Sequence, residues 1–235
     1  MIIDVVAVER NRRRITPRMM APDTLWHAMG QRMEERLLEV RPAADRRILI
    51  APAAVPCIAS EHRMPGEWLQ LPAQHYAVAM HLGALHLAND VPGILVQMRL
   101  ALAPGGLLIA MFAGGETLRE LRAALAAAES QVLGGISPRV IPFLNPEEGG
   151  NLLTRAGFKE PVIDRETLTL TYPDLTTLMH ELRAMGQANP LAARQKSFTP
   201  RGLFVAAEEY YRARFSDREH RLRMTVELVT LTAWA

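Results

Sequence analysis

Histidines gather in one short segment that could carry acid–base or metal chemistry. His75, His81 and His86 lie before, inside and near the end of the apolar stretch YAVAMHLGALHL, residues 76–87. In an open α/β sheet, the end of such a strand borders the crevice where ligands bind. No cysteine or acid completes a recognisable zinc spacing around these imidazoles, so we predict no metal site.

A loop elsewhere has the position of a nucleotide-binding loop but not its composition. RRILIAPAAVPCIAS, residues 46–60, has the pattern of a buried strand that runs into a turn. Nucleotide-binding loops are rich in glycine, because backbone N–H groups must approach the ligand closely. This loop contains no glycine, and its prolines, Pro52 and Pro56, lack N–H groups. The only cysteine, Cys57, has no obvious base beside it, so we interpret it as a small apolar residue.

The elements that must position these residues alternate between strands and helices. Strands are expected over 47–51, 76–82, 107–112, 162–172 and 224–234. Helices are expected over 24–40, with Asp23 as N-cap, over 92–102, ended by APGG at 103–106, and over 116–131, 146–156, 174–186 and 200–214. This order predicts an α/β fold with parallel core strands, and the two late alternating strands predict an antiparallel addition.

Composition and charge restrict the class of protein. With 235 residues, a net charge of +2 and one cysteine, the chain fits a single α/β domain in a reducing compartment. The first residues have the wrong charge order for a secretory signal, and no apolar run is long enough to span a membrane, so we expect a cytoplasmic protein. Arginines at positions 10, 12, 13, 14 and 18 form either a solvated N-terminal arm or a docking arm for an acidic partner or nucleic acid. No aromatic residue lies among them, which disfavours nucleic acid.

Five segments in order carry a family resemblance. They are LHLANDVPGIL (85–95), MFAGGETLRELR (111–122), GGISPRVIPF (134–143), LLTRAGF (152–158) and YPDLTTLMHELRAMGQAN (172–189). Together they resemble the class I S-adenosylmethionine-dependent methyltransferases. The similarity is strongest to the branch of the mitochondrial complex I assembly factor with a methyltransferase fold, near the malonyl-carrier-protein methyltransferase of biotin synthesis.

The resemblance implies a Rossmann-like sheet in the order 3-2-1-4-5-7-6, which this chain is too short to complete. Roughly 24 residues separate the first strand from LPAQHYAVAM, whereas a helix–strand–helix–strand passage needs about 40. We therefore expect a truncated sheet, with strands 2 and 3 reduced or missing and the order 1-4-5-7-6 kept. GEWLQLP, residues 66–72, could be a remnant strand or a cover for the exposed edge.

Within one domain over 1–235, we expect an N-terminal arm and helix (1–45), a reduced cofactor half (46–131) and a substrate or partner half (132–235). The resemblance assigns cofactor binding to the loop Ala51, Pro52, Ala53 and Ala54 and to the strand end His81, Leu82 and Gly83. It assigns substrate or partner contacts to Gly114, Gly115, Thr117, Arg119, Ser137 and Arg139, although a tight turn also explains the glycine pair. His86, Asn89 and Asp90 are weak catalytic candidates, with a helix cap before Val91 as the alternative.

Three functions follow from these expectations. The first is a pseudoenzyme whose S-adenosylmethionine site is lost or weakened. Such a protein would bind a protein partner, in assembly of a respiratory complex or as a homo- or hetero-oligomer through the strand-1 edge. The second is an active methyltransferase or protein-arginine hydroxylase, as the family implies. The third is a divergent α/β enzyme with another ligand in the same crevice. Only Glu61 and Glu67 lie between Ala51 and Gln74 as acids for a cofactor ribose, which favours the first.

Overall fold

The computed structural model describes residues 2–40, 46–55, 59–143 and 146–235, and these group into two compact units. The unit called here the sheet unit comprises Pro17–Gly115, Leu144–Glu166 and Leu228–Ala235. The unit called the helical unit comprises Met1–Thr16, Glu116–Phe143 and Thr167–Glu227. In the described part of the chain, no helix is both long and apolar enough to cross a membrane.

A single mixed sheet has the strand order β2-β1-β3-β4-β6-β5. The strands are β1 (Arg47–Ile50), β2 (Glu61–Arg63), β3 (Tyr76–Leu82), β4 (Leu102–Ala113), β5 (Lys159–Tyr172) and β6 (Leu222–Trp234). The first four strands in the order are parallel to one another, and β6 runs antiparallel to β4. The expected order 1-4-5-7-6 corresponds to β1-β3-β4-β6-β5, so the predicted Rossmann-like α/β fold is confirmed.

The connection between β1 and β3 contains only one short regular element among its described residues, the strand β2. The prediction of a strand in GEWLQLP is wrong. Gln97 of helix α3 (Val91–Ala101) holds this segment instead, because its side chain accepts a hydrogen bond from Leu69 N and donates one to Glu67 O. Whether this connection represents the loss of the family's strands 2 and 3 stays a prediction.

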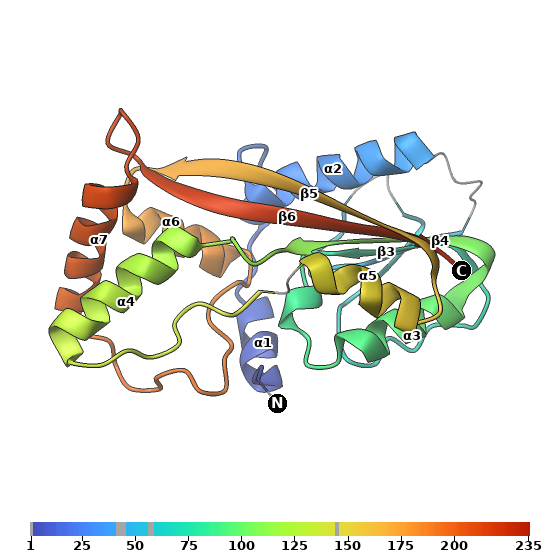
Figure 1. Cartoon of the computed structure of the whole chain (residues 1–235), viewed down its shortest axis with the longest axis horizontal. Coiled ribbons are helices and arrows are strands. Elements are labelled where there is room, and N and C mark those ends of the chain that lie inside the picture. Colours follow the sequence, from blue (N-terminus) through green and yellow to red (C-terminus); the bar gives the residue numbers. More distant parts are fainter. Residues whose placement is uncertain (1, 41–45, 56–58, 144–145) are drawn as a thin grey trace. The chain divides into compact units, whose positions relative to one another are not determined.

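Helices cover both faces of the sheet within the sheet unit. Helix α2 (Leu25–Val40) lies along one face, and α3 and α5 (Pro146–Arg155) lie against the other (Figure 1). The core on the α3 and α5 side combines apolar residues of four strands and both helices, among them Ile48, Ala79, Leu108, Leu231 and Leu95. The short 3-10 helices η1 (Pro17–Met20) and η2 (Leu85–Leu87) belong to the same unit.

The start of α2 differs from the sequence prediction by one residue. Thr24, not Asp23, caps the helix, since its hydroxyl accepts a hydrogen bond from His27 N. The same hydroxyl donates to Met19 O at 2.7 Å, and Thr24 is buried. Asp23 remains at the surface and pairs with Arg18 at 2.5 Å. A buried threonine with a fixed acceptor therefore displaces the exposed aspartate from the capping position.

The helical unit contains α1 (Val5–Arg12), α4 (Arg119–Leu133), α6 (Leu175–Ala184) and α7 (Arg201–Phe215). Helices α4 and α7 pack side by side (Figure 1). The residues they bury include Leu121, Ala124, Leu203, Ala207 and Tyr211. The predicted N-cap Asp174 and the positive-φ residue Gly186 are both found at the ends of α6.

Arg10, Arg13 and Arg14 are exposed, as the interpretation of a solvated arm expected, but the segment before Arg13 forms the helix α1. Asp4 accepts a hydrogen bond from Ala7 N and begins α1. Asn11 is 2% exposed, and its side-chain amide donates to Ala188 O at 2.7 Å. Because a buried amide anchors one side of the helix, the arginines around it are held in fixed positions.

Strand β4 begins earlier than predicted, at Leu102. The APGG segment, residues 103–106, belongs to this strand and is not a separate stop after α3. Gly105 has φ +73, and its N–H donates to Ala235 O at 3.2 Å. A Cβ on Gly106 would lie 2.8 Å from Ala103 O and 3.2 Å from Ala77 O. Gly106 therefore permits the close approach of β4 to β3.

We expect Gly106→Ala to lower the free energy of unfolding by about 3 kcal/mol, because the added methyl group meets backbone oxygens that cannot move independently. Gly105→Ala is the matched control. At Gly105 no atom lies within 4 Å of the added Cβ, so only the left-handed backbone, at about 1 kcal/mol, opposes the change. Urea denaturation measures both, and equal losses would contradict the close-approach explanation.

Candidate functional site

The carboxyl ends of β1, β3 and β4 lie at one edge of the sheet unit. Ile50 pairs with His81, and His81 pairs with Ala110, so the three strands reach this edge in register. The two groups of predicted cofactor residues, 51–54 and 81–83, are therefore brought to the same edge. Gly114 and Gly115 follow β4 in the same unit. This edge is the candidate ligand site.

The loop after β1 uses its first backbone groups within the fold. Ala51 N donates to Arg63 O at 3.1 Å, and Ala51 O lies 2.9 Å from His62 Nε2, which donates to it. Pro52 has no N–H to offer. Val55 packs against α2, because its Cγ1 lies 3.1 Å from the position a Cβ of Gly30 would occupy. The first two positions of the loop, Ala51 and Pro52, thus offer no backbone donor to a ligand.

An indole from α2 fills the space beside the end of β3. Gly83 has φ +68, and a Cβ at this position would lie 2.6 Å from Cζ3 of Trp26. Trp26 is 3% exposed. The sequence prediction missed Trp26, because nothing in the local pattern of α2 shows that this helix crosses the end of β3.

Both acids available for a ribose are bound to other parts of the fold. Glu61 accepts a hydrogen bond from the hydroxyl of Tyr76 at 2.9 Å. Burial and this carboxylate raise the pKa of Tyr76 to about 12. Glu67 accepts hydrogen bonds from the backbone N–H groups of Asn89 and Asp90, at 2.8 and 3.1 Å. These contacts attach β2 and the 67–69 segment to the rest of the unit.

The predicted catalytic residues follow β3 in the chain, and two of them have positions that serve the fold. His86 is buried in η2. Asp90 caps α3, since its carboxylate accepts a hydrogen bond from Gly93 N at 2.8 Å. Asp90 therefore has the capping role that was the alternative for it, and catalysis by these residues stays a prediction. Among the described residues, no group of three or more His, Cys, Asp or Glu is placed to hold a metal ion.

These observations test whether S-adenosylmethionine, the cofactor implied by the resemblance, fits this edge. A ligand of this kind needs backbone donors in the first loop and an acid for the ribose hydroxyls. The loop lacks glycine, Glu61 and Glu67 are engaged by Tyr76 and by backbone N–H groups, and Trp26 occupies the space at Gly83. The residues present do not fit the cofactor in this binding mode.

Two of the predicted substrate or partner residues lie at the start of α4 in the helical unit. Thr117 is buried, and its hydroxyl accepts from Glu227 N at 3.1 Å and lies 3.2 Å from Glu227 O. Arg119 is exposed and pairs with Glu116 at 3.0 Å. Thr117 therefore attaches α4 to β6, whereas Arg119 remains accessible at the surface.

The other two predicted residues, Ser137 and Arg139, are tied to a buried acid of α4. Glu129 is 2% exposed and accepts hydrogen bonds from Ser137 N and Oγ, at 2.7 and 2.6 Å. Arg139 donates to the same carboxylate at 2.8 Å and also to Gln195 and Thr199. Glu129 thus fixes the GGISPR turn, a role that the sequence prediction did not foresee because the partners lie on separate segments.

Burial raises the pKa of Glu129, but the hydrogen bonds from Ser137 and Arg139 outweigh burial and hold its pKa below the ordinary value of 4.5. The charged carboxylate therefore stabilises the folded state above that value, and this contribution is lost as the pH falls through the lowered pKa.

We expect Glu129→Gln to lower the free energy of unfolding at neutral pH by about 3 kcal/mol, because Arg139, whose side chain is 15% exposed, keeps its charge without a counter-charge. The variant should also lose less stability than the wild type when the pH is lowered below 4.5. Glu116→Gln is the control, since it breaks only an exposed pair with Arg119 and should change stability by less than about 0.5 kcal/mol. Urea denaturation across pH measures all three proteins, and parallel pH profiles would contradict the role of Glu129.

The amino-acid sequence is similar to those of two groups of named enzymes. No family model matches the chain. The arginine-hydroxylase NDUFAF5, mitochondrial, of Rattus norvegicus is 32% identical over 168 residues, which are 72% of this chain and 49% of the relative. A malonyl-[acyl-carrier protein] O-methyltransferase of Xylella fastidiosa is 38% identical over 151 residues, 64% of this chain and 49% of the relative. The chain thus spans about half the length of the curated relatives it matches.

Solved structures agree on the fold. The YcgJ protein from Bacillus subtilis superposes with a TM-score of 0.53, at 9% sequence identity, over 87% of this chain and 97% of that protein. At this identity the likeness concerns the fold alone. Together with the sequence matches it places the chain in the NDUFAF5-like branch of proteins with the class I methyltransferase fold, as a homologue of the arginine-hydroxylases NDUFAF5 and the malonyl-[acyl-carrier protein] O-methyltransferases.

Proposed function

We propose that this chain is a methyltransferase-like protein that has lost the binding of S-adenosylmethionine and acts by binding another protein. One observation carries the proposal: Glu61 and Glu67, the acids between Ala51 and Gln74, hold β2 and the 67–69 segment in place. If either acid turned toward a ligand, a buried phenol or two backbone N–H groups would lose their partner. The site could form only at the expense of the fold around it.

The position of Trp26 adds independent support. Its ring lies beside Gly83, at the end of the strand next to β1. Helix α2 is anchored at a second place, where Arg32 pairs with Glu166 of β5 at 2.9 Å. Because α2 is fixed by this pair and by its buried residues, withdrawal of the indole would require movement of the helix.

Strand β1 is not the edge that the sequence analysis expected, because β2 pairs with it on one side and β3 on the other. We therefore propose the sheet edge at β2 as the place of a homo- or hetero-oligomeric contact. Strand β2 matches β1 over three residue pairs, Ile48 to Ile50 against Glu61 to Arg63. Its outer side forms the edge of the sheet. Short edge strands limit unwanted pairing, but they also accept an added strand. Assembly of a respiratory complex remains part of the proposal as the context of such a partner.

An active enzyme is the second candidate. The relatives are named as enzymes, arginine-hydroxylases and O-methyltransferases. Their sequence identity of 32–38% to this chain favours descent from an active enzyme. Such an enzyme would have to hold its cofactor in a mode other than the one that the residues at this edge exclude.

The cellular location is also a proposal. We keep the cytoplasm as the proposed location, whereas the NDUFAF5 relatives carry the word mitochondrial in their names. Immunoblotting of separated cell fractions from the native host would decide between the two.

We expect isothermal titration of the purified full-length chain with S-adenosylmethionine to give no saturable heat, which corresponds to a Kd weaker than about 1 mM. The physical reason is that the loop after β1 has no glycine and that the indole of Trp26 fills the space beside Gly83. A cofactor-binding methyltransferase, titrated in the same buffer, is the positive control. A micromolar Kd for this chain would overturn the proposal and favour the enzyme.

A further inference from the structure

Two chain segments meet in the helical unit at the carboxyl ends of α1 and α6. Thr16 N donates to Ala184 O at 3.2 Å, and the amide of Asn11 donates to Ala188 O. Gly186 lies against Ile15, whose Cγ1 would be 3.2 Å from an added Cβ. Residues 10–16 and 183–188 therefore run side by side as one folded surface.

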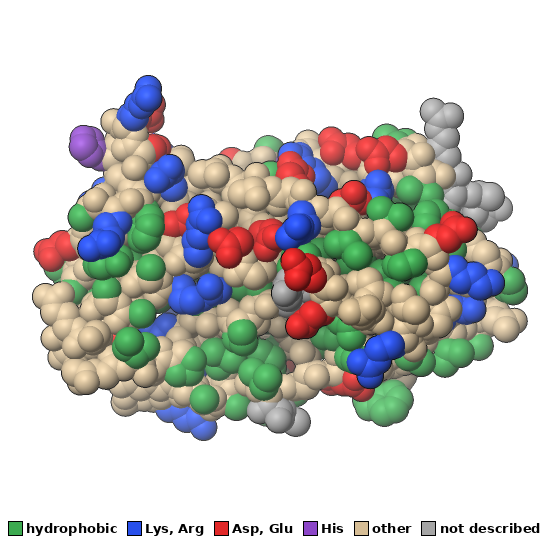
Figure 2. All heavy atoms as spheres, viewed as in Figure 1, with side chains coloured by type: hydrophobic (Ala, Val, Ile, Leu, Met, Phe, Trp, Pro, Cys, Tyr) green, Lys and Arg blue, Asp and Glu red, His purple; other side chains and the backbone are tan. Residues whose placement is uncertain are grey.

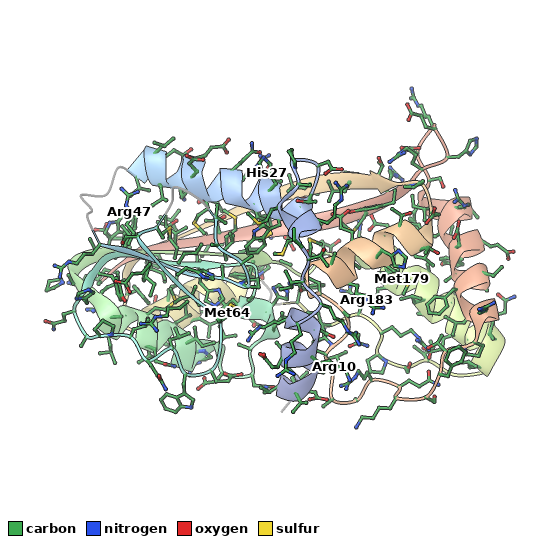
Figure 3. The ribbon with its side chains drawn as sticks, turned by 180° about the vertical axis from the view of Figure 1, so that it is seen from behind. Arg10, His27, Arg47, Met64, Met179 and Arg183 are labelled. Atoms are coloured by element: carbon green, nitrogen blue, oxygen red, sulfur yellow. The ribbon has the colours of Figure 1, made fainter. Side chains whose placement is uncertain are left out.

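Arginines crowd this surface without matching acids. Arg10, Arg14 and Arg183 are exposed, and within the described residues none of the three forms an ion pair. Arg13 is 79% exposed and reaches Glu9 only at 3.8 Å. Figure 3 shows Arg10 on α1 and Arg183 on α6 in the same region. We call Arg10, Arg13, Arg14 and Arg183 the arginine surface.

The helix ends explain only part of this charge. A helix carboxyl end carries roughly half a negative charge and favours one nearby cation. Two helices end here, and the nearby acids are Glu9, which also pairs with Arg12, and Glu181, two residues before Arg183. Four arginines exceed these negative charges, so a net positive surface remains.

On the face drawn in Figure 2, acidic and basic side chains are interspersed. The net charge of the whole chain is only +2. The arginine surface is therefore a local feature and not part of a generally basic protein. Local charge of this kind attracts and orients an oppositely charged partner.

We propose that the arginine surface binds an acidic segment of a partner polypeptide. Guanidinium groups bind carboxylates through paired hydrogen bonds, and here they are held on folded elements, which reduces the entropy lost on binding. On the same helix and just before it, Ile2, Val5 and Val6 are 65%, 47% and 79% exposed. Apolar residues flanking the acids of the partner would contact them.

Other anionic partners fit this surface less well. No aromatic side chain lies among the arginines to stack on bases, which disfavours single-stranded nucleic acid. Helix α1 has only 8 residues, and its exposed apolar residues are Val5 and Val6, with Ile2 just before it, which is a small area for insertion into a membrane. The inference rests on the proposed function, because it names the chemistry of the protein partner.

The test is fluorescence anisotropy with the full-length chain and a fluorescein-labelled peptide of alternating glutamate and leucine residues. We expect saturable binding that weakens when the ionic strength rises from about 20 to 200 mM. The variant R10A/R14A/R183A should bind at least about tenfold more weakly, because three charge contacts of up to 1 kcal/mol each are lost. A variant with lysine at these three positions should recover part of the affinity.

The matched control is K196A/R201A/R218A, which removes the same charge from exposed positions elsewhere in the helical unit. It should keep the wild-type affinity within about twofold. Equal losses in both variants, absence of peptide binding, or binding of phosphatidylglycerol vesicles in preference to the peptide would each overturn the inference. Binding of S-adenosylmethionine would overturn the proposed function alone. The titration with S-adenosylmethionine does not depend on the outcome of the peptide experiment.

Discussion

The sheet depends on the direct parallel pairing of β1 with β3 across a connection that contains no helix in its described residues. Parallel neighbours are normally joined by a helix that covers the sheet. Here the connection forms β2 and then crosses to α3, where Gln97 and the backbone of Asn89 and Asp90 hold it. Polar side chains at this connection, especially Glu61 and Glu67, are therefore required by the fold.

This constraint decides what the edge of the sheet can bind. In a Rossmann-like domain, the carboxyl ends of the strands provide backbone donors and an acid to a nucleotide. In this chain neither Ala51 nor Pro52 has a free backbone donor, the acids stabilise the connection, and Trp26 from α2 lies against Gly83. The acids of this connection thus serve the fold, and the indole of Trp26 takes the space that a ligand would need beside Gly83.

In the helical unit, buried acids hold the fold together and exposed arginines face solvent. Glu129 is buried and receives three hydrogen bonds, so it fixes a turn. Glu120 is likewise buried and accepts a hydrogen bond from Thr225 N. The arginines at the ends of α1 and α6 instead face solvent. Because the acids that would neutralise them are used inside the unit or elsewhere, positive charge accumulates at this one surface.

The sequence alone determined the order of elements, because hydrophobic periodicity, helix caps and glycines act over neighbouring residues. It predicted the order β1-β3-β4-β6-β5 but not the edge strand β2, and it placed a helix correctly between Asp174 and Gly186. It misplaced the N-cap of α2 and the start of β4. It also could not show that Trp26 meets Gly83 or that Glu67 reaches Asn89. Those contacts join segments far apart in the chain, and only the tertiary structure decides which side chains meet, since packing and burial select one partner among many.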